Sequence, residues 1–171
     1  MRTSWRGPSG ALINGTDDCR VGTVFFAALT KLLDTATLVG GATRGNIQLF
    51  DAATRSLAIV VQRGFGKEFL EFFAHVHEGE AACGATMMSG KRVVVEDVTD
   101  SPIFFRTPAL ELMLDAGARA VQSTPLFDGA GRLVGVLSTH YREPRSLEED
   151  DLRQLDVIAR RTAQLIIHGT P

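Results

Sequence analysis

The pattern of apolar and polar residues is clearest between Arg119 and Tyr141, where two apolar runs of strand length flank Asp128–Gly131. The glycines of this short connection supply the positive φ angles of a tight turn, so the pattern predicts a β-hairpin. Both faces of the second run begin apolar, which predicts a strand that is covered on both sides. One face then ends in a hydroxyl and an imidazole, which are either satisfied structurally or available to a ligand. That face is expected to carry Val134, Val136, Ser138 and His140, and the other face Leu133, Gly135, Leu137 and Thr139.

Helical periodicity marks both ends of the chain. Apolar residues recur at three- and four-residue steps from Cys19 to about Thr37, and Gly40 and Gly41 end that pattern. A second stripe follows Ser146 and Glu149, whose S-x-x-E spacing predicts a capping box. The chain therefore begins and ends with an amphipathic helix. Part of the first stripe could instead pair with a second subunit.

The middle of the chain mixes strands with short helices. Asn46–Phe50 and Leu57–Gln62 predict a first hairpin, and Arg92–Val98 predicts another strand. Lys67–His77 predicts a helix with Phe69, Phe72, Phe73 and Val76 on one side and with His75 and His77 in solvent. The small residues of 79–90 predict a short helix close to the sheet. Thr107 before Pro108 predicts the start of a helix over Ala109–Ala116, which Gly117 ends.

This order of elements predicts an α+β fold. A central antiparallel sheet of five to six strands would carry the N- and C-terminal helices on one face. The short helices and loops of the middle segments would then cover a cleft on the other face, which is the natural position for a ligand.

Composition narrows the class of protein. The chain has 171 residues and a net charge of −2, with 18 basic and 20 acidic residues interspersed. We therefore expect one domain over 19–168, a tail or linker over 1–18, and no nucleic-acid partner. Cys19 and Cys83 make neither a disulfide framework nor a zinc site, so a reducing cytoplasm is the expected location. No uninterrupted apolar run approaches the roughly 18 residues typical of a membrane span, so no membrane partner is expected.

The predicted cleft has a candidate set of ligand-binding residues. Strand alternation places Val121 and Ser123 on the same side of the sheet as Ser138 and His140. The residues expected to cover them are Cys83, Met87, Phe104 and Phe105. Such a cleft would be mainly apolar, with a few hydroxyls and one imidazole, and would suit a small neutral or weakly polar ligand. The alternative is a collapsed cleft filled by Phe and Met side chains.

Three ordered segments resemble the GAF domain family. GEAACGATMMSGKRVVVEDV is similar to the family's G-x-x-C-G-x-A segment with its following strand, ARAVQSTPL to its strand ending in Pro-Leu, and GRLVGVLSTHY to its G-x-L-x-G-V-L strand. The closest likeness is to the GAF domains of bacterial sensor histidine kinases and related signalling proteins. The resemblance implies an antiparallel sheet, a ligand on one face, and terminal helices packed together on the other, often in a dimer.

The family hosts several functions, and the residues favour some over others. A free methionine sulfoxide reductase would use Cys83 as its thiolate, but no resolving cysteine is evident in 92–117. The substrate-holding acids of that branch would fall on Val121, Ser138 and His140. Bilin attachment would need a Cys-His pair, and cyclic-nucleotide binding an N-K-F-D-E-like set; the chain has neither. A haem would have only His140 as an axial ligand near the cleft. No cofactor is evident, although an unknown small ligand is possible.

The resemblance thus implies a non-catalytic, cytoplasmic sensory module. It would bind a small molecule in the cleft or dimerise through its terminal helices, and relay the change to a histidine kinase or another output domain. The alternative is the thiol-dependent reductase using Cys83.

Overall fold

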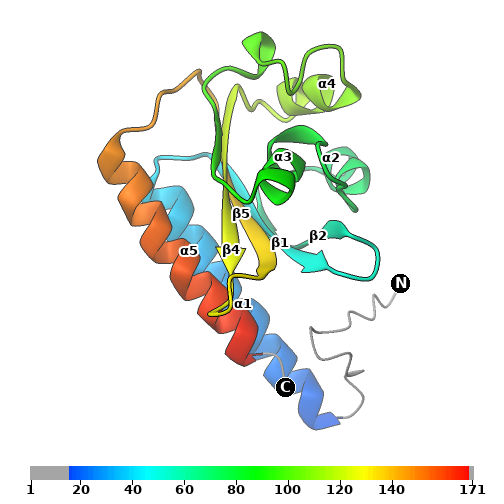
Figure 1. Cartoon of the computed structure of the whole chain (residues 1–171), viewed down its shortest axis with the longest axis vertical. Helices are drawn as coiled ribbons and strands as arrows, with labels where there is room; N and C mark the ends of the chain where they lie inside the picture. The colour runs from blue at the N-terminus through cyan, green and yellow to red at the C-terminus, as the bar shows by residue number, and fades with distance from the viewer. Residues whose placement is uncertain (1–15, 170–171) are drawn as a thin grey trace.

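The computed structural model describes residues 16–169 and contains one five-stranded sheet with helices on both faces (Figure 1). Residues 1–15, most of the predicted tail, lie outside the described residues, whereas Thr16–Asp18 already belong to the first helix. In chain order the elements are α1 (Thr16–Val39), β1 (Arg44–Asp51), β2 (Ser56–Arg63), α2 (Lys67–Phe72), α3 (Ala81–Ser89), β3 (Val93–Val95), a 3₁₀ turn (Val98–Asp100), α4 (Pro108–Asp115), β4 (Ala120–Phe127), β5 (Leu133–Tyr141) and α5 (Glu149–Gly169).

The sheet has the strand order β2-β1-β5-β4-β3, and every neighbouring pair is antiparallel. The predicted hairpin forms β4 and β5 in the centre, next to β1. β3 is an edge strand of three residues and pairs only with Val121–Ser123 of β4. β4 runs on through Pro125, which lies opposite Val136 of β5. The predicted α+β class and strand arrangement are confirmed.

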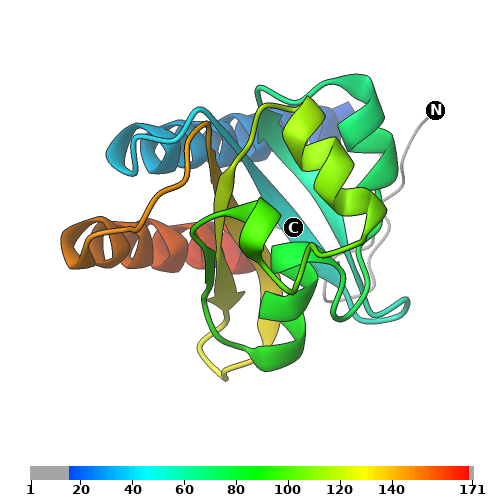
Figure 2. The same ribbon diagram turned by 90° about the horizontal axis from the view of Figure 1, so that it is seen from above.

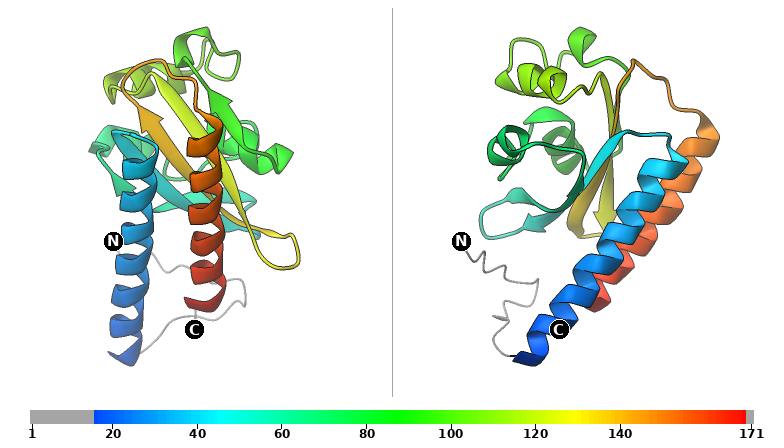
Figure 3. Two further views of the ribbon diagram at one scale, coloured as in Figure 1. Left: turned by 90° about the vertical axis from the view of Figure 1, so that its left-hand side faces the viewer. Right: turned by 180° about the vertical axis from the view of Figure 1, so that it is seen from behind.

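Two hydrophobic cores lie on opposite faces of the sheet. On one face α1 and α5 lie side by side and run in opposite directions (Figure 3). Their buried side chains pack against Ile47, Leu49, Leu126 and Leu137 of the sheet. On the other face, α2, α3, α4 and their loops cover the sheet (Figure 2). Both faces are therefore buried, as the apolar start of the β5 run predicts.

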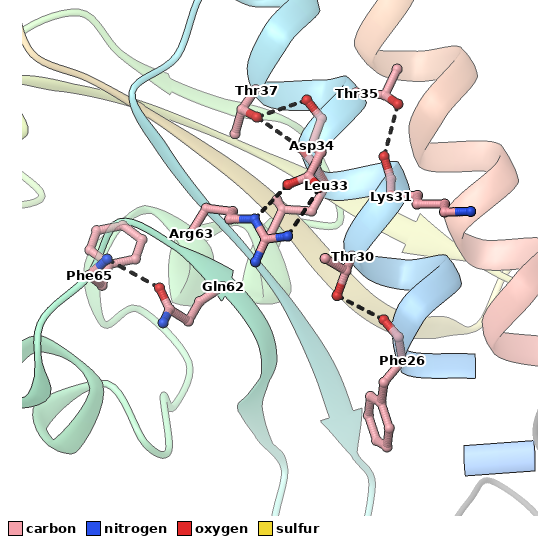
Figure 4. Close-up of polar contacts among 10 residues, drawn as sticks. All are labelled: Phe26, Thr30, Lys31, Leu33, Asp34, Thr35, Thr37, Gln62, Arg63 and Phe65. Carbon is pink, nitrogen blue, oxygen red and sulfur yellow. Dashed lines mark hydrogen bonds and ion pairs between the residues drawn. The ribbon is translucent and has the colours of Figure 1, made fainter. Parts of the chain in front are cut away.

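The α1 helix meets the sheet through the predicted stripe. Phe25, Leu29 and Ala36 of that stripe are buried and Leu33 is buried beside them, whereas Val24, which was expected in the stripe, is exposed. On its outer side an ion pair ties α1 to β2, with the Nε of Arg63 2.6 Å from an oxygen of Asp34 (Figure 4).

The Gly22–Val39 part of α1 is long and apolar enough to cross a membrane by length and composition alone, with a mean hydropathy of 1.3. A helix that packs on its own domain passes the same test. The composition of α1 is therefore weak evidence of a membrane span, and the expectation of no membrane partner stays a prediction.

The end of α2 and the start of α5 differ from the sequence prediction. α2 ends at Phe72, and the chain then turns so that Val76 pairs with Leu57. Phe72 is consequently exposed rather than in the predicted aromatic stripe, while His75 and His77 are exposed as expected. The predicted capping box is absent, because α5 begins only at Glu149 and Ser146 lies in the connection before it, where its hydroxyl donates to the carboxylate of Glu96.

One face of the predicted hairpin also needs correction. The pairing of β4 with β5 shifts between Leu126 and Phe127, so Phe127 lies opposite Leu133 and Val134 is left over in a bulge. A bulge reverses the alternation of side chains beyond it. As a result Val134 packs with the α1–α5 core, and Leu133 packs with Val136 on the other face.

Candidate functional site

A small cavity of about 20 Å³ lies between the sheet and the segments that cover it. This volume has room for about one water molecule. Its floor comes from β1, β4 and β5, and its cover comes from α2, α3, α4 and the loop before α4. The cavity lies where the sequence predicts a cleft, but it is nearly filled by side chains, as the collapsed alternative expects.

A row of three polar side chains crosses the floor. Asn46 of β1 lies opposite Ser138 of β5, which lies opposite Ser123 of β4. The two serine hydroxyls are hydrogen-bonded at 2.8 Å, and all three residues are buried. Because side chains opposite each other on one sheet face are neighbours, the register itself assembles this row.

The imidazole of His140 lies at one end of the floor. The Phe65 ring meets it edge-on, with centroids 4.9 Å apart, and Phe69 lies beyond at 6.1 Å. Burial, with a smaller contribution from the positive charge of Arg44, lowers the pKa of His140 to about 3. His140 is therefore neutral at physiological pH and presents one nitrogen as a hydrogen-bond acceptor.

The half-buried Cys83 lies in the cover of the cavity, on α3. Burial raises the pKa of its thiol to about 11, and the charge of Glu80 adds to that rise. A thiol with this pKa stays protonated at neutral pH, whereas a reactive cysteine needs a lowered pKa. Cys83 is the free cysteine among the residues whose side chains the structure describes.

Backbone geometry brings α3 close to the sheet. Ala81 opens the helix with a left-handed φ of 51°, which costs roughly 1–2 kcal/mol for a residue with a Cβ atom. A Cβ atom on Gly84 would lie 2.3 Å from the backbone oxygen of His77, so only glycine fits there. Two residues further along, the Thr86 hydroxyl donates to the backbone oxygen of Ser123 at 3.3 Å, which fixes α3 to β4.

Six of the eight predicted ligand-binding residues line the cavity: Cys83, Phe104, Val121, Ser123, Ser138 and His140. Two predicted positions are wrong. Phe105 points to solvent with 63% of its surface exposed, because the turn before α4 directs its ring away from that of Phe104, and the guanidinium of Arg106 lies over it. Met87 is buried in the core one helical turn beyond Cys83 and does not reach the cavity. Ligand binding by the other six stays a prediction.

The sequence analysis missed Asn46 and Gln48, which line the cavity from β1. Their alternation with Ile47 and Leu49 was a usable signal, because it places both amides on one strand face. The aromatic side chains of α2 and its C-terminal end, Phe69 and Phe73, were assigned only to the core but also line the cavity, as does Met113 of α4.

Three atoms in this cavity have no hydrogen-bond partner. They are Oδ1 of Asn46, Oε1 of Gln48 and Nδ1 of His140, and within the described part of the chain no other buried side-chain nitrogen or oxygen lacks one. An unsatisfied buried acceptor costs about 1–3 kcal/mol. Among the described residues, no group of three or more His, Cys, Asp or Glu side chains is placed to hold a metal ion.

The opposite face of the same strands carries a chain of hydrogen bonds. The Nε of Arg92 donates to the Thr124 hydroxyl at 3.1 Å, and that hydroxyl donates to Oε1 of Gln122 at 2.8 Å. The Gln122 amide donates to Thr139 at 3.2 Å, whose hydroxyl is 2.8 Å from that of Tyr141. Gln122 and Thr139 are the chain neighbours of Ser123 and Ser138, so their side chains point to the opposite face of the sheet.

Arg92 connects this chain of hydrogen bonds to α5. Its guanidinium donates to the backbone oxygen of Leu152 at 3.3 Å and forms an ion pair with the Asp156 carboxylate. The strands that form the cavity floor are thus bonded, through their other face, to the C-terminal helix.

A second, open groove lies beside β3. Most of its charged groups are already paired: Asp97 with Arg119, Glu96 with Ser146, and Arg145 with Asp151. The last two of these contacts hold the connection before α5 in place.

Comparison with known proteins agrees with this fold. Solved structures with the same fold include a domain of a protein described as a two-component sensor histidine kinase from Sinorhizobium meliloti 1021, with 23% identity and a TM-score of 0.69 over 84% of this chain and 90% of that one. The free methionine-R-sulfoxide reductase of Neisseria meningitidis has 20% identity and a TM-score of 0.69, over 88% and 86% of the two chains. A GAF domain region of a Geobacter sulfurreducens PCA protein has 19% identity and a TM-score of 0.71, over 89% and 99%.

The search among curated protein sequences found no match. The family model described as "GAF domain" matches residues 27–166, from the middle of α1 to near the end of α5. That range includes the whole sheet, the cavity and the segments that cover it. The chain therefore belongs to the GAF domain family.

Proposed function

We propose that this chain is a non-catalytic sensory module of bacterial signal transduction, working in the cytoplasm. A small molecule in the cavity would change the packing of α1 and α5, and these helices would pass the change to an output domain such as a histidine kinase. The observation that carries the proposal is the double role of β4 and β5. One face forms the cavity floor, and the other is hydrogen-bonded through Thr124 and Arg92 to α5.

The direction of such a signal follows from differential binding. A ligand shifts the equilibrium between two arrangements only as far as its affinities for them differ. The cavity is small, so a ligand would favour an arrangement in which the cover lies farther from the sheet. Thr86 links that cover to β4, beside the serine pair.

The test combines native mass spectrometry with NMR. The full chain, purified from its expression host under mild conditions, should retain a small molecule that denaturation releases. Adding this molecule back should shift the amide resonances of α1 and α5 in the wild type. In an Arg92→Met variant the cavity resonances should still shift, but those of α5 should shift less. Binding that leaves both helices unchanged would overturn the relay.

We further propose that the terminal helices form a homodimer. Val24, Leu38 and Val157 expose 69%, 82% and 42% of their surfaces on α1 and α5. Light scattering on the full chain should give twice the monomer mass, and Leu38→Glu should give a monomer. Leu114→Glu, at a position of α4 that exposes 40% of its surface on the other side of the sheet, is the matched control and should stay dimeric. A monomeric wild type would contradict the proposal.

The second candidate function is thiol-dependent reduction of free methionine sulfoxide. Two observations favour it: Cys83 lies in the cavity wall, and proteins with this activity share the fold. The raised pKa of Cys83 argues against it. Turnover of free methionine sulfoxide by the wild type that disappears in Cys83→Ser would establish the enzyme and overturn the non-catalytic proposal.

A further inference from the structure

The three unpartnered atoms of the cavity indicate what chemistry it can bind. The residues that carry them, Asn46, Gln48 and His140, expose 4%, 1% and 4% of their surfaces and all line the same cavity. Buried polar groups in proteins are normally hydrogen-bonded. Three unpartnered atoms around one cavity mark the place where a hydrogen-bonding molecule from outside the chain would bind.

All three atoms can act as acceptors. The two amide oxygens accept hydrogen bonds, and a neutral imidazole keeps one nitrogen lone pair free. The Ser123 and Ser138 hydroxyls bond to each other, which occupies one donor and leaves a single hydroxyl hydrogen between them. The three buried atoms that lack a partner can thus all accept, and a ligand that satisfies them must donate hydrogen bonds.

The charges around the cavity favour a neutral ligand. No aspartate, glutamate, lysine or arginine lines it, so a buried ion would make no direct contact with an opposite charge. Arg44 lies opposite His140 on β1 and donates to the backbone oxygens of Gly64 and Gly117, which keeps its positive charge close to that end of the cavity. A cation would be repelled by this charge, and an anion in the cavity would face the unpartnered side-chain oxygens of Asn46 and Gln48.

We propose that the cavity binds a small uncharged molecule of the primary-amide class, whose two N–H groups donate to two of the three acceptors on Asn46, Gln48 and His140. The space of about 20 Å³ holds only about one water molecule, so the amide requires an arrangement in which the cover lies farther from the sheet, and the rings of Phe69, Phe73 and Phe104 then limit it to a few non-hydrogen atoms. The inference rests on the proposed sensory function, since it names the class of ligand for the same cavity.

The test uses three probes of similar shape on the full-length, ¹⁵N-labelled chain. Acetamide donates two hydrogen bonds, acetone has the same shape and donates none, and acetate replaces the amide by an anion. Acetamide should shift the imidazole nitrogens of His140 and the side-chain amides of Asn46 and Gln48 in a saturable way. The other two probes should bind at least about tenfold more weakly, or not at all.

Variants test the named acceptors. Asn46→Leu keeps the shape of the side chain but removes one acceptor, so the affinity for acetamide should fall about tenfold while the unfolding temperature is unchanged or higher. Gln164→Leu, on the exposed side of α5, should change neither. If Asn46→Leu does not fold, the comparison of the three probes on the wild type decides.

Two results would overturn the ligand class. One is an equal response to acetamide and acetone, and the other is no response to acetamide, which would leave an ordered water as the cavity's only partner. A different molecule retained on purification would then leave the sensory function standing. Conversely, acetamide binding without any shift in α1 and α5 would support the ligand class and refute the relay.

Discussion

The hydroxyl of Ser123 lies 2.8 Å from that of Ser138, and this buried pair joins the two central strands in the cavity floor. Each hydroxyl supplies the partner that the other loses from water on folding. The pair therefore contributes to stability as well as to the surface that a ligand would meet.

Ser138→Ala is expected to destabilise the fold by about 1–3 kcal/mol, because it leaves the Ser123 hydroxyl buried without this partner. The double variant Ser123→Ala/Ser138→Ala should recover part of that loss, since neither hydroxyl then needs a partner. Urea unfolding of the wild type, both single variants and the double variant measures the coupling. Losses that simply add would show that the two hydroxyls do not depend on each other.

The folded chain should lose stability as the pH falls below 6.5, and His140 is the reason. In the unfolded chain a histidine takes up a proton near pH 6.5, whereas the pKa of His140 in the fold is about 3. Between these two pKa values the unfolded state binds more protons, so the free energy of unfolding falls by up to about 1.4 kcal/mol for each unit by which the pH is lowered. Urea unfolding between pH 6.5 and 4.5 should show this slope.

His140→Phe supplies the matched comparison for this pH dependence. A phenyl ring can keep the edge-on contact with Phe65 but cannot take up a proton. The slope between pH 6.5 and 4.5 should become smaller in this variant, whatever its absolute stability. An unchanged slope would mean that His140 is not the group responsible.

Cys83 should react slowly with iodoacetamide at pH 7.5, because its thiol has a pKa of about 11 in the fold. Mass spectrometry of the native chain at several pH values measures the rate, and the same reaction in urea gives the unfolded reference. The rate in the fold should rise only as the pH approaches 11. Rapid labelling at neutral pH would indicate a reactive thiolate and would favour the reductase.

Arg92→Met should destabilise the fold by about 1–3 kcal/mol, because Arg92 hydrogen-bonds both Thr124 and the Asp156 carboxylate and is largely buried. Arg153→Met is the control, since the pairs of Arg153 with Glu149 and Asp150 are exposed on α5. That variant should change stability by less than about 1 kcal/mol. Equal losses would show that the Arg92 contacts contribute no more than a surface ion pair.

Glycine substitutions test the packing of the sheet. Gly135→Ala should destabilise strongly, because the new Cβ atom would lie 2.3 Å from the backbone oxygen of Gln48. Gly22→Ala should instead stabilise by about 0.5–1 kcal/mol, since it lies in α1 with nothing within 4 Å and alanine favours a helix. Thermal unfolding should give a lower unfolding temperature for Gly135→Ala and a higher one for Gly22→Ala.

The sequence predicted the order of elements because periodicity reports burial directly. The α1 stripe and the apolar start of β5 are examples, since each repeats with the period of its element. The bulge at Val134 was not predictable in this way, because it depends on the pairing of Phe127 with Leu133. Alternation within one strand carries no information about its neighbour's register.

The candidate site was predicted best where it lies on strands. Ser123, Ser138 and His140 follow from alternation, whereas Phe104 and Phe105 occupy a turn in which neighbouring side chains diverge without a fixed period. Asn46 and Gln48 were missed because a polar face usually indicates solvent. Here that face is covered by segments far along the chain, which a local pattern does not reveal.

The shortness of β3 has a consequence for the behaviour of this chain at high concentration. An exposed edge strand offers free backbone groups to other sheets, which promotes aggregation. β3 offers backbone hydrogen-bonding groups over only three residues, and beyond it Pro125 of β4 has no N–H to donate. An incoming strand would find too few consecutive hydrogen-bonding groups to add to the sheet. This edge is thereby protected against strand addition, which would leave the helical face free to make the chain's specific contacts.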